Sequence, residues 1–167
     1  MISVRIPDSR KLLSDLLTKN TFDLFVLGEA QITTFTTFRI DGTWHPEYFE
    51  SSNQSGAAPA RDEEPSWSRI RPIIFEMAKG KHTPLSFRII LKLPKASLQS
   101  LLNVSKAAYT ADQVDGLFMN ISYQGEVVTC TSGSSMKTFT QDKSLDHIWD
   151  DMMLRFFAVK GIETEKL

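Results

Sequence analysis

Leu85-Ser86-Phe87-Arg88-Ile89-Ile90-Leu91-Lys92-Leu93 carries the plainest structural pattern in the chain. Every odd position is a large apolar residue, whereas Ser86, Arg88 and Lys92 occupy even positions. This alternation is typical of a strand with one buried face and one face in water. Pro94 ends the strand, and a helix is expected directly after it from the spacing of Leu98, Leu101 and Leu102.

Three more strands and a helix are expected downstream. The strands cover Leu117 to Tyr123, Glu126 to Ser132 and Ser135 to Thr140, with turns at Gln124-Gly125 and Gly133-Ser134. The helix stops at Gly161. Its apolar stripe consists of Leu145, Ile148, Trp149, Met152 and Phe156.

The N-terminal half predicts the same order of elements. Ile2 to Ile6 alternates as a short strand, and a helix follows Asp8. Phe22 to Ile40 is extended, and Gly28 either divides it into two strands or marks a bulge. Asp41-Gly42 predicts a hairpin turn with a returning strand from Thr43 to Phe49. A second helix starts after Ser66 or Ser68, and Pro72, tolerated only near a first turn, favours Ser68.

The fold class that follows is α+β. We expect one domain over residues 1–167, built from two β-α-β-β-β-α halves at 1–80 and 84–162, with an exposed loop over 51–66. The sheet is mostly antiparallel and the helices pack on a face. This element order is similar to that of sliding-clamp domains, although a likeness of fold does not establish function.

Composition favours a soluble protein of the cytoplasm. Hydrophobic residues make up 41% of the 167 residues and charged residues 23%, which is ordinary for a globular chain. No run approaches the roughly 18 apolar residues of a membrane helix, and no signal peptide is expected. The single cysteine, Cys130, excludes an internal disulfide and fits a reducing compartment.

Charge is unevenly distributed along the chain. Residues 66–106 contain eight lysines and arginines but one acid, Glu76, and the flanking segments are acidic. We interpret this middle segment as a basic face for a protein or nucleic acid, against the alternative that its charges scatter over the surface. The candidate binding residues are Arg69, Arg71, Lys79, Lys81, His82, Arg88, Lys92 and Lys95.

Catalytic motifs are not evident. Gly80-Lys81-His82-Thr83 follows a helix and precedes a strand, so it is not a P-loop, although this turn offers cations to an anion or to the helix dipole. Ser134 and Lys137 have the S-x-x-K spacing of acyl-transfer enzymes, but residues three apart on a strand face opposite ways. We therefore predict no catalytic residue, metal or cofactor.

Other polar groups have structural interpretations. The three histidines are too dispersed for metal spacing, and His45 near Asp41 and Glu47 is interpreted as part of an exposed turn. Cys130 is expected to face inward as a small hydrophobe. The three aspartates of the last helix are interpreted as a solvated face: Asp146, Asp150 and Asp151.

One exposed sheet surface is a further candidate. Thr33 to Thr37 is rich in threonine and contains Phe35. A flat face of this kind with an aromatic side chain stacks bases or docks a protein, and the alternative is ordinary exposed strand residues.

Three strings together indicate a family. They are Thr33-Thr34-Phe35-Thr36-Thr37-Phe38-Arg39-Ile40-Asp41-Gly42, the segment from Ile70-Arg71-Pro72 through Lys79-Gly80-Lys81-His82-Thr83-Pro84, and Thr129-Cys130-Thr131-Ser132-Gly133. The chain resembles an uncharacterised family of small proteins from clostridial gut bacteria, a domain of unknown function. The resemblance implies a bacterial cytoplasmic setting and brings no activity or cofactor.

The function expected from the sequence is therefore non-catalytic binding or scaffolding through the basic middle segment. A clamp-like nucleic-acid processivity or repair accessory is one alternative, and it requires an oligomer. A small enzyme with residues assembled across the fold is the other, and it requires a deep pocket with titratable groups of perturbed pKa.

Overall fold

The computed structural model describes residues 1–50 and 64–167, and they form one seven-stranded sheet with helices on a single face. The strand order is β3-β2-β4-β5-β6-β1-β7, and every neighbouring pair is antiparallel. The α+β prediction is therefore confirmed. The elements are β1 (Ser3–Ile6), α1 (Ser9–Leu17), β2 (Val26–Thr33), β3 (Thr37–Ile40), α2 (Glu47–Glu50), α3 (Trp67–Ala78), β4 (Ser86–Lys92), α4 (Lys95–Ser105), the 3-10 turn η1 (Ala111–Gln113), β5 (Val114–Gln124), β6 (Val127–Met136), α5 (Ser144–Val159) and β7 (Glu165–Lys166).

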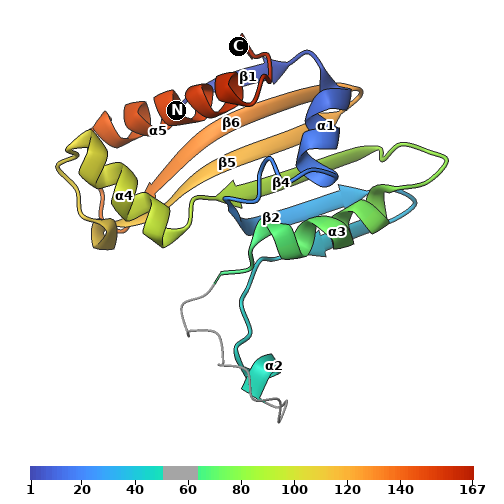
Figure 1. The fold of residues 1–167 in the computed structure, drawn as a ribbon, viewed down its shortest axis with the longest axis horizontal. Coiled ribbons are helices and arrows are strands. Elements are labelled where there is room, and N and C mark those ends of the chain that lie inside the picture. Colours follow the sequence, from blue (N-terminus) through green and yellow to red (C-terminus); the bar gives the residue numbers. More distant parts are fainter. Residues whose placement is uncertain (51–63) are drawn as a thin grey trace.

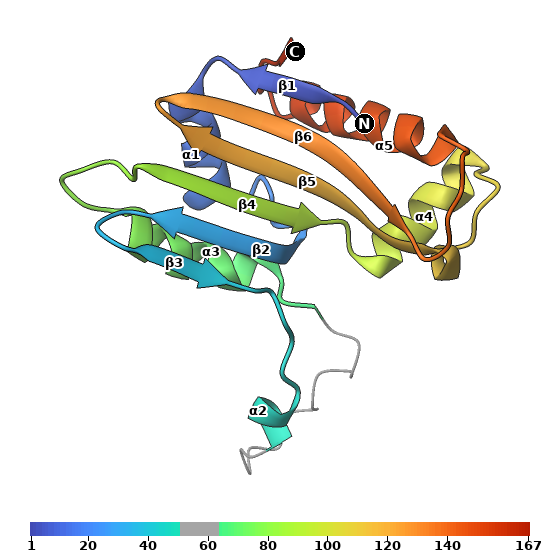
Figure 2. The same cartoon turned by 180° about the vertical axis from the view of Figure 1, so that it is seen from behind.

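Two faces of the sheet differ completely. Helices α1, α3 and α5 lie in front of the strands in Figure 1 and behind them in Figure 2, where the other face is uncovered by any described helix. On β4 the odd residues Phe87, Ile89 and Leu91 are buried on the helix side, as the alternation predicted. We call the opposite side, which carries Arg88 and its neighbours on other strands, the open face.

The core lies between the sheet and its helices. Trp67 of α3 and Trp149 of α5 are both at most 1% exposed. Each indole also donates a hydrogen bond to a backbone carbonyl, from Trp67 to Leu16 at 3.1 Å and from Trp149 to Phe118 at 2.8 Å. These bonds fix α3 against the end of α1 and fix α5 against the centre of the sheet, because a buried indole N–H without an acceptor is costly.

Three predicted features of the sheet are wrong. No strand returns over Thr43–Phe49, because the Asp41 carboxylate accepts a hydrogen bond from the Thr43 amide at 2.9 Å and turns the chain away from β3 into the short α2. No turn interrupts β6 at Gly133-Ser134, since Gly133 pairs with Phe118 in an unbroken ladder. The strand predicted over Ser135–Thr140 is absent too, as β6 ends at Met136 and a loop leads to α5.

Among the smaller predictions, some are confirmed and others are wrong. The extended stretch predicted from Phe22 becomes strand only at Val26, and Gly28 is a bulge, because the pairing of β2 with β4 shifts register between Leu27 and Glu29. Ser66, and not Ser68, precedes the first residue of α3, so the helix begins two residues earlier than Pro72 suggested, with Trp67 buried as its first residue. Cys130 faces inward and is fully buried, as predicted.

Candidate binding surface on the open face of the sheet

The predicted basic residues do not gather on one surface. Arg71 of α3 makes a two-pronged ion pair with Asp23, with bonds of 2.9 and 3.1 Å, and its side chain is 17% exposed. Lys92 is held by Glu64 at 2.6 Å. Both cations are therefore committed to structural partners, and neither offers a free charge to a ligand.

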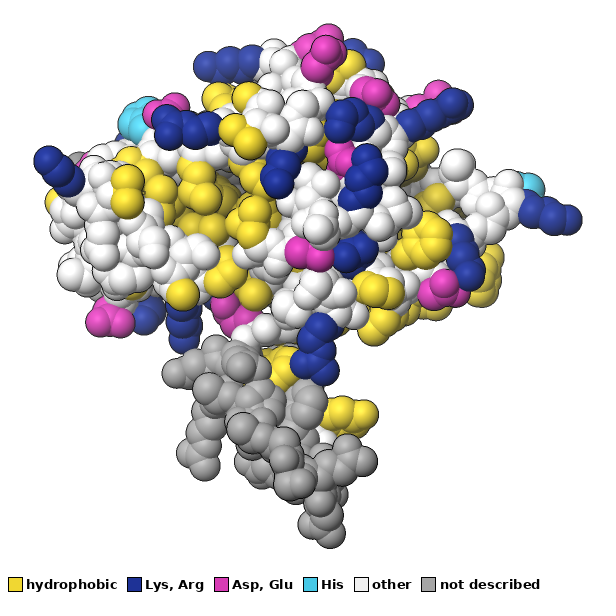
Figure 3. Space-filling model, in the orientation of Figure 1, with side chains coloured by type: hydrophobic (Ala, Val, Ile, Leu, Met, Phe, Trp, Pro, Cys, Tyr) yellow, Lys and Arg dark blue, Asp and Glu magenta, His cyan; other side chains and the backbone are white. Residues whose placement is uncertain are grey.

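The other predicted residues lie far apart in the fold. Arg69 of α3 lies over the ring of Trp44, with 5.7 Å between guanidinium and ring centre. Lys95 begins α4 at one end of the molecule, whereas Lys79, Lys81 and His82 occupy the loop between α3 and β4 at the other (Figure 1). On the helix side, dark blue cationic side chains alternate with acidic and hydrophobic ones (Figure 3).

Arg88 and Lys92 both lie on the open face of β4, and Arg88 also belongs to a wider arrangement there. Strand register aligns one residue from each of six neighbouring strands into a single row across the sheet. From β3 to β1 the row runs Arg39, Gln31, Arg88, Ser122, Thr129 and Arg5. Strands lie about 4.8 Å apart, which separates Arg39 from Arg88 by about 10 Å and Arg88 from Arg5 by about 14 Å. We call this set the arginine row.

A hollow of about 480 Å³ lies beside the arginine row. Its walls include Ile90, Phe118 and Asn120, which follow in the next rows of the open face, together with Arg88. Glycines make the space: Gly28 and Gly133 line it without side chains, and the ring of Phe118 reaches over Gly116, where a Cβ would lie 2.6 Å from the ring. The open face thus offers an aromatic ring, an amide and a guanidinium around one depression.

The three arginines of the arginine row have different partners. Arg39 pairs with Glu29 at 3.2 Å, and Arg5 approaches Glu165 at 4.0 Å. Arg88 is exposed, and its Nε donates to the neutral Asn120 Oδ1 at 3.3 Å. Exposed ion pairs are worth at most about 1 kcal/mol, so a phosphate or carboxylate can replace these acids at little cost.

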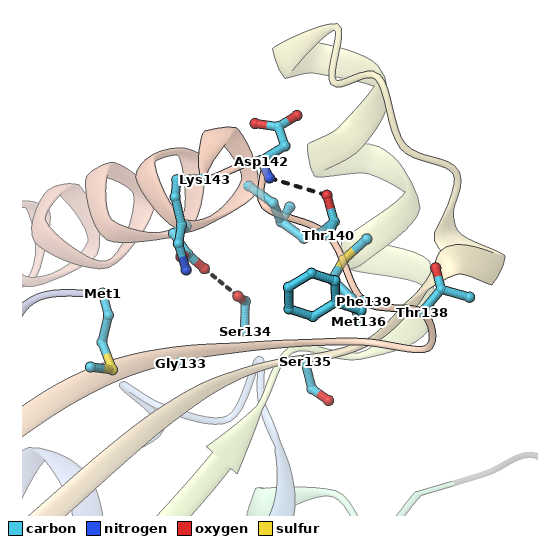
Figure 4. A pocket seen from close by; sticks show the side chains of 12 residues that line it. Met1, Gly133, Ser134, Ser135, Met136, Thr138, Phe139, Thr140, Asp142 and Lys143 are labelled. Carbon is cyan, nitrogen blue, oxygen red and sulfur yellow. Dashed lines mark hydrogen bonds and ion pairs between the residues drawn. The ribbon is translucent and has the colours of Figure 1, made fainter.

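A second hollow, of about 430 Å³, lies where β6 meets the start of α5 (Figure 4). The expectation of a solvated acidic face is wrong for two aspartates of α5. Asp146, which lines this hollow, accepts a hydrogen bond from Ser134, and Asp150, one turn further along α5, accepts one from Ser132. Their side chains are only 16% and 14% exposed. These bonds fasten α5 to β6, so the polar groups of this hollow largely satisfy one another.

Electrostatics agree with that structural role. Burial raises the pKa of Asp146, but the hydrogen bond from Ser134 and the positive charges of the amino terminus and Lys143 together hold it below its ordinary value. Burial raises the pKa of the Cys130 thiol far above its usual range, which removes its nucleophilic character at neutral pH.

The turn after β3 is exposed, as predicted. His45 Nδ1 lies 3.0 Å from Glu47, and hydrogen bonds from Thr43 lower the pKa of Asp41. No group of three His, Cys, Asp or Glu residues suited to a metal ion occurs within residues 1–50 and 64–167.

Comparison with known proteins identifies the family. Residues 15–165 match the model of a family of unknown function, DUF5721, and the chain belongs to this family. The expected membership of a domain of unknown function is thereby confirmed. No curated protein and no solved structure matches the chain. Among the described helices, none is both long and apolar enough to cross a bilayer.

Proposed function

We propose that this protein is a non-catalytic binding protein whose ligand is single-stranded nucleic acid lying across the open face. The observation that supports this most strongly is the arginine row beside the hollow that contains Phe118. The proposal keeps the predicted binding role but moves it from the basic middle segment to residues drawn from both halves of the chain.

The arginine row provides the phosphate contacts of the proposed site. Arg39, Arg88 and Arg5 project from the same side of the sheet, and the uncharged polar residues Gln31, Ser122 and Thr129 separate them. Guanidinium groups bind phosphate oxygens through two parallel hydrogen bonds, which a lysine cannot do. A strand of nucleic acid running perpendicular to the β-strands meets these three side chains in succession.

The hollow beside the arginine row provides the base contacts of the proposed site. The hollow is large enough for a nucleobase, and Phe118 provides a ring on which a base stacks, a contact worth about 1–3 kcal/mol per base. Asn120 and Thr131 offer hydrogen bonds to base edges at the same place. Bases in a duplex are already stacked and paired, so a hollow of this shape favours a single strand.

The test is fluorescence anisotropy with labelled ten-residue oligo-dT and oligo-U. Arg88→Glu is compared with Arg155→Glu, which makes the same charge change at an exposed position of α5 on the helix side. We expect Arg88→Glu to weaken binding at least tenfold and Arg155→Glu to leave it nearly unchanged.

Salt dependence gives a second readout. Three phosphate contacts predict a log–log slope of about −2, which is an affinity loss of about 20-fold between 50 and 200 mM salt. Equal effects of the two substitutions, or no binding at 50 mM salt, would rule out the open face as a nucleic-acid surface.

A clamp-like accessory is the second candidate, and the element order supports it. Strand, helix, two strands and helix occur in both halves once the short α2, η1 and β7 are set aside. Each half has one strand fewer than the sequence predicted, but the repeated order supports an internal duplication. One such chain cannot encircle a duplex, so this function needs a ring-forming oligomer in the cytoplasm. Sedimentation analysis tests it, because a monomer at all concentrations excludes a ring.

A further inference from the structure

We propose that a second surface, at the end of the molecule formed by the α3–β4 loop, docks an acidic protein segment that carries a large apolar side chain. The surface is a hollow of about 380 Å³, which we call the tip hollow. Phe35, Met77, Ala78 and Leu85 line it, and Lys79, Lys81 and His82 stand around it. It is separate from the hollow beside the arginine row and does not depend on nucleic-acid binding.

Hydrogen bonds hold the two loops that form the tip hollow. The Lys79 amide donates to the Phe75 carbonyl at 2.8 Å where α3 ends, and the Leu85 amide donates to Thr33 at 2.8 Å where the loop rejoins the sheet. Across from it, the Thr34 amide donates to Thr36 at 2.9 Å and closes the β2–β3 turn. These bonds anchor the ends of both loops, which lowers the entropy cost of ordering the loops when a ligand binds.

Apolar exposure marks this end of the molecule as an interaction site. Phe35 is 93% exposed and Leu85 is 69% exposed. Phe35 meets the edge of Phe38 at 6.0 Å and does not fold into the core. Large apolar side chains around a concave surface are typical of protein docking sites, because a partner's side chain removes them from water.

The cations around the tip hollow and the Thr34 hydroxyl favour an acidic partner. Lys81 and His82 are exposed and make no ion pair with any described residue, whereas Lys79 has only the exposed Glu76, at 2.7 Å. The Thr34 hydroxyl is buried at the hollow and has no hydrogen-bond partner within residues 1–50 and 64–167. An acidic segment supplies carboxylates to the cations and a polar group to this hydroxyl.

The occupant is a peptide segment and not a nucleobase because most of the apolar residues that line the hollow are aliphatic. Met77, Ala78 and Leu85 offer no hydrogen bonds to base edges, but they suit an inserted Leu, Phe or Trp. An apolar centre with charged groups around it is also the usual arrangement of a protein interface.

The experiment is a display selection of random twelve-residue peptides on the full chain, followed by affinity measurements with the enriched peptides. We expect enrichment of sequences in which a Trp, Phe or Leu is flanked by Asp or Glu. Binding should weaken at least tenfold in the double variant Lys79→Glu, Lys81→Glu and in Leu85→Asp. Lys95→Glu, an exposed charge reversal at the opposite end of the molecule, should leave binding unchanged.

Circular dichroism confirms that each variant is folded before its affinity is compared. No enrichment, enrichment of peptides without acidic residues, or equal loss in Lys95→Glu would overturn the proposal. Competition between an enriched peptide and oligo-dT would also contradict it, because the two ligands are assigned to separate surfaces.

Discussion

Removing one acid from the open face should strengthen nucleic-acid binding. Glu29 pairs with Arg39 at 3.2 Å, and a phosphate on Arg39 would lie about 6 Å from this carboxylate. Two like charges at about 6 Å repel by about 0.7 kcal/mol in water and by about 3 kcal/mol at a protein surface of low effective dielectric. The Glu29 side chain is 33% exposed, so we take a value near the lower limit, about 1 kcal/mol.

Glu29→Gln should therefore raise affinity for oligo-dT about fivefold at 50 mM salt. Anisotropy titrations measure the change, and Asp151→Asn on the exposed side of α5 is the matched control. The gain should shrink at 0.5 M salt, because screening acts on exposed charges. Unchanged or weaker binding in Glu29→Gln, or an equal gain in Asp151→Asn, would show that Glu29 does not oppose phosphate binding at Arg39.

Three predictions concern the scaffold of this surface. Trp149→Phe removes the indole bond to Phe118 and leaves a cavity, so urea denaturation should show a loss of about 2–3 kcal/mol in unfolding free energy, and a loss under 0.5 kcal/mol would contradict this. Gly116→Ala places a methyl 2.6 Å from the Phe118 ring, so the ring must shift. The affinity for oligo-dT should therefore fall although Arg88 is unchanged, and the thermal midpoint should change little. Unchanged affinity would show that the ring takes no part. Burial raises the pKa of Asp15, but two lysines lower it further, to below the ordinary 3.8. Ionised Asp15 therefore contributes stability above pH 3.8, and this contribution is lost on acidification through the lower native pKa. The urea midpoints of wild type and Asp15→Asn should converge as the pH falls. A difference that stays constant with pH would contradict this prediction.

Local patterns predicted the buried side of β4 and of β6. The alternation from Leu85 to Leu93 identified the buried face of β4, and the inward position of Cys130 followed from the same period. Such patterns depend on short-range geometry, so they do not require knowledge of the neighbouring strands.

The arginine row was not predictable by the same means. Arg5 and Arg39 join Arg88 only because β1 pairs with β6 and β2 pairs with β4, and both pairings connect distant parts of the chain. The charge cluster over 66–106 pointed elsewhere, because a count along the chain does not register ion pairs such as that of Arg71 with Asp23.

The errors in strand prediction have a similar origin. Gly133-Ser134 has the composition of a turn, but long-range pairing of Gly133 with Phe118 keeps β6 continuous. That continuity places Ser132 opposite Asp150 and Ser134 opposite Asp146, which is why two aspartates interpreted as solvated are bonded to the sheet.

Mapping of amide NMR shifts during titration with ten-residue oligo-dT tests the central claim most directly. We expect the largest changes on the open face, at Gln31, Arg88, Asn120 and Thr131, and small changes along the outer sides of α1, α3 and α5. Changes confined to the helices, or no changes at 50 mM salt, would contradict it.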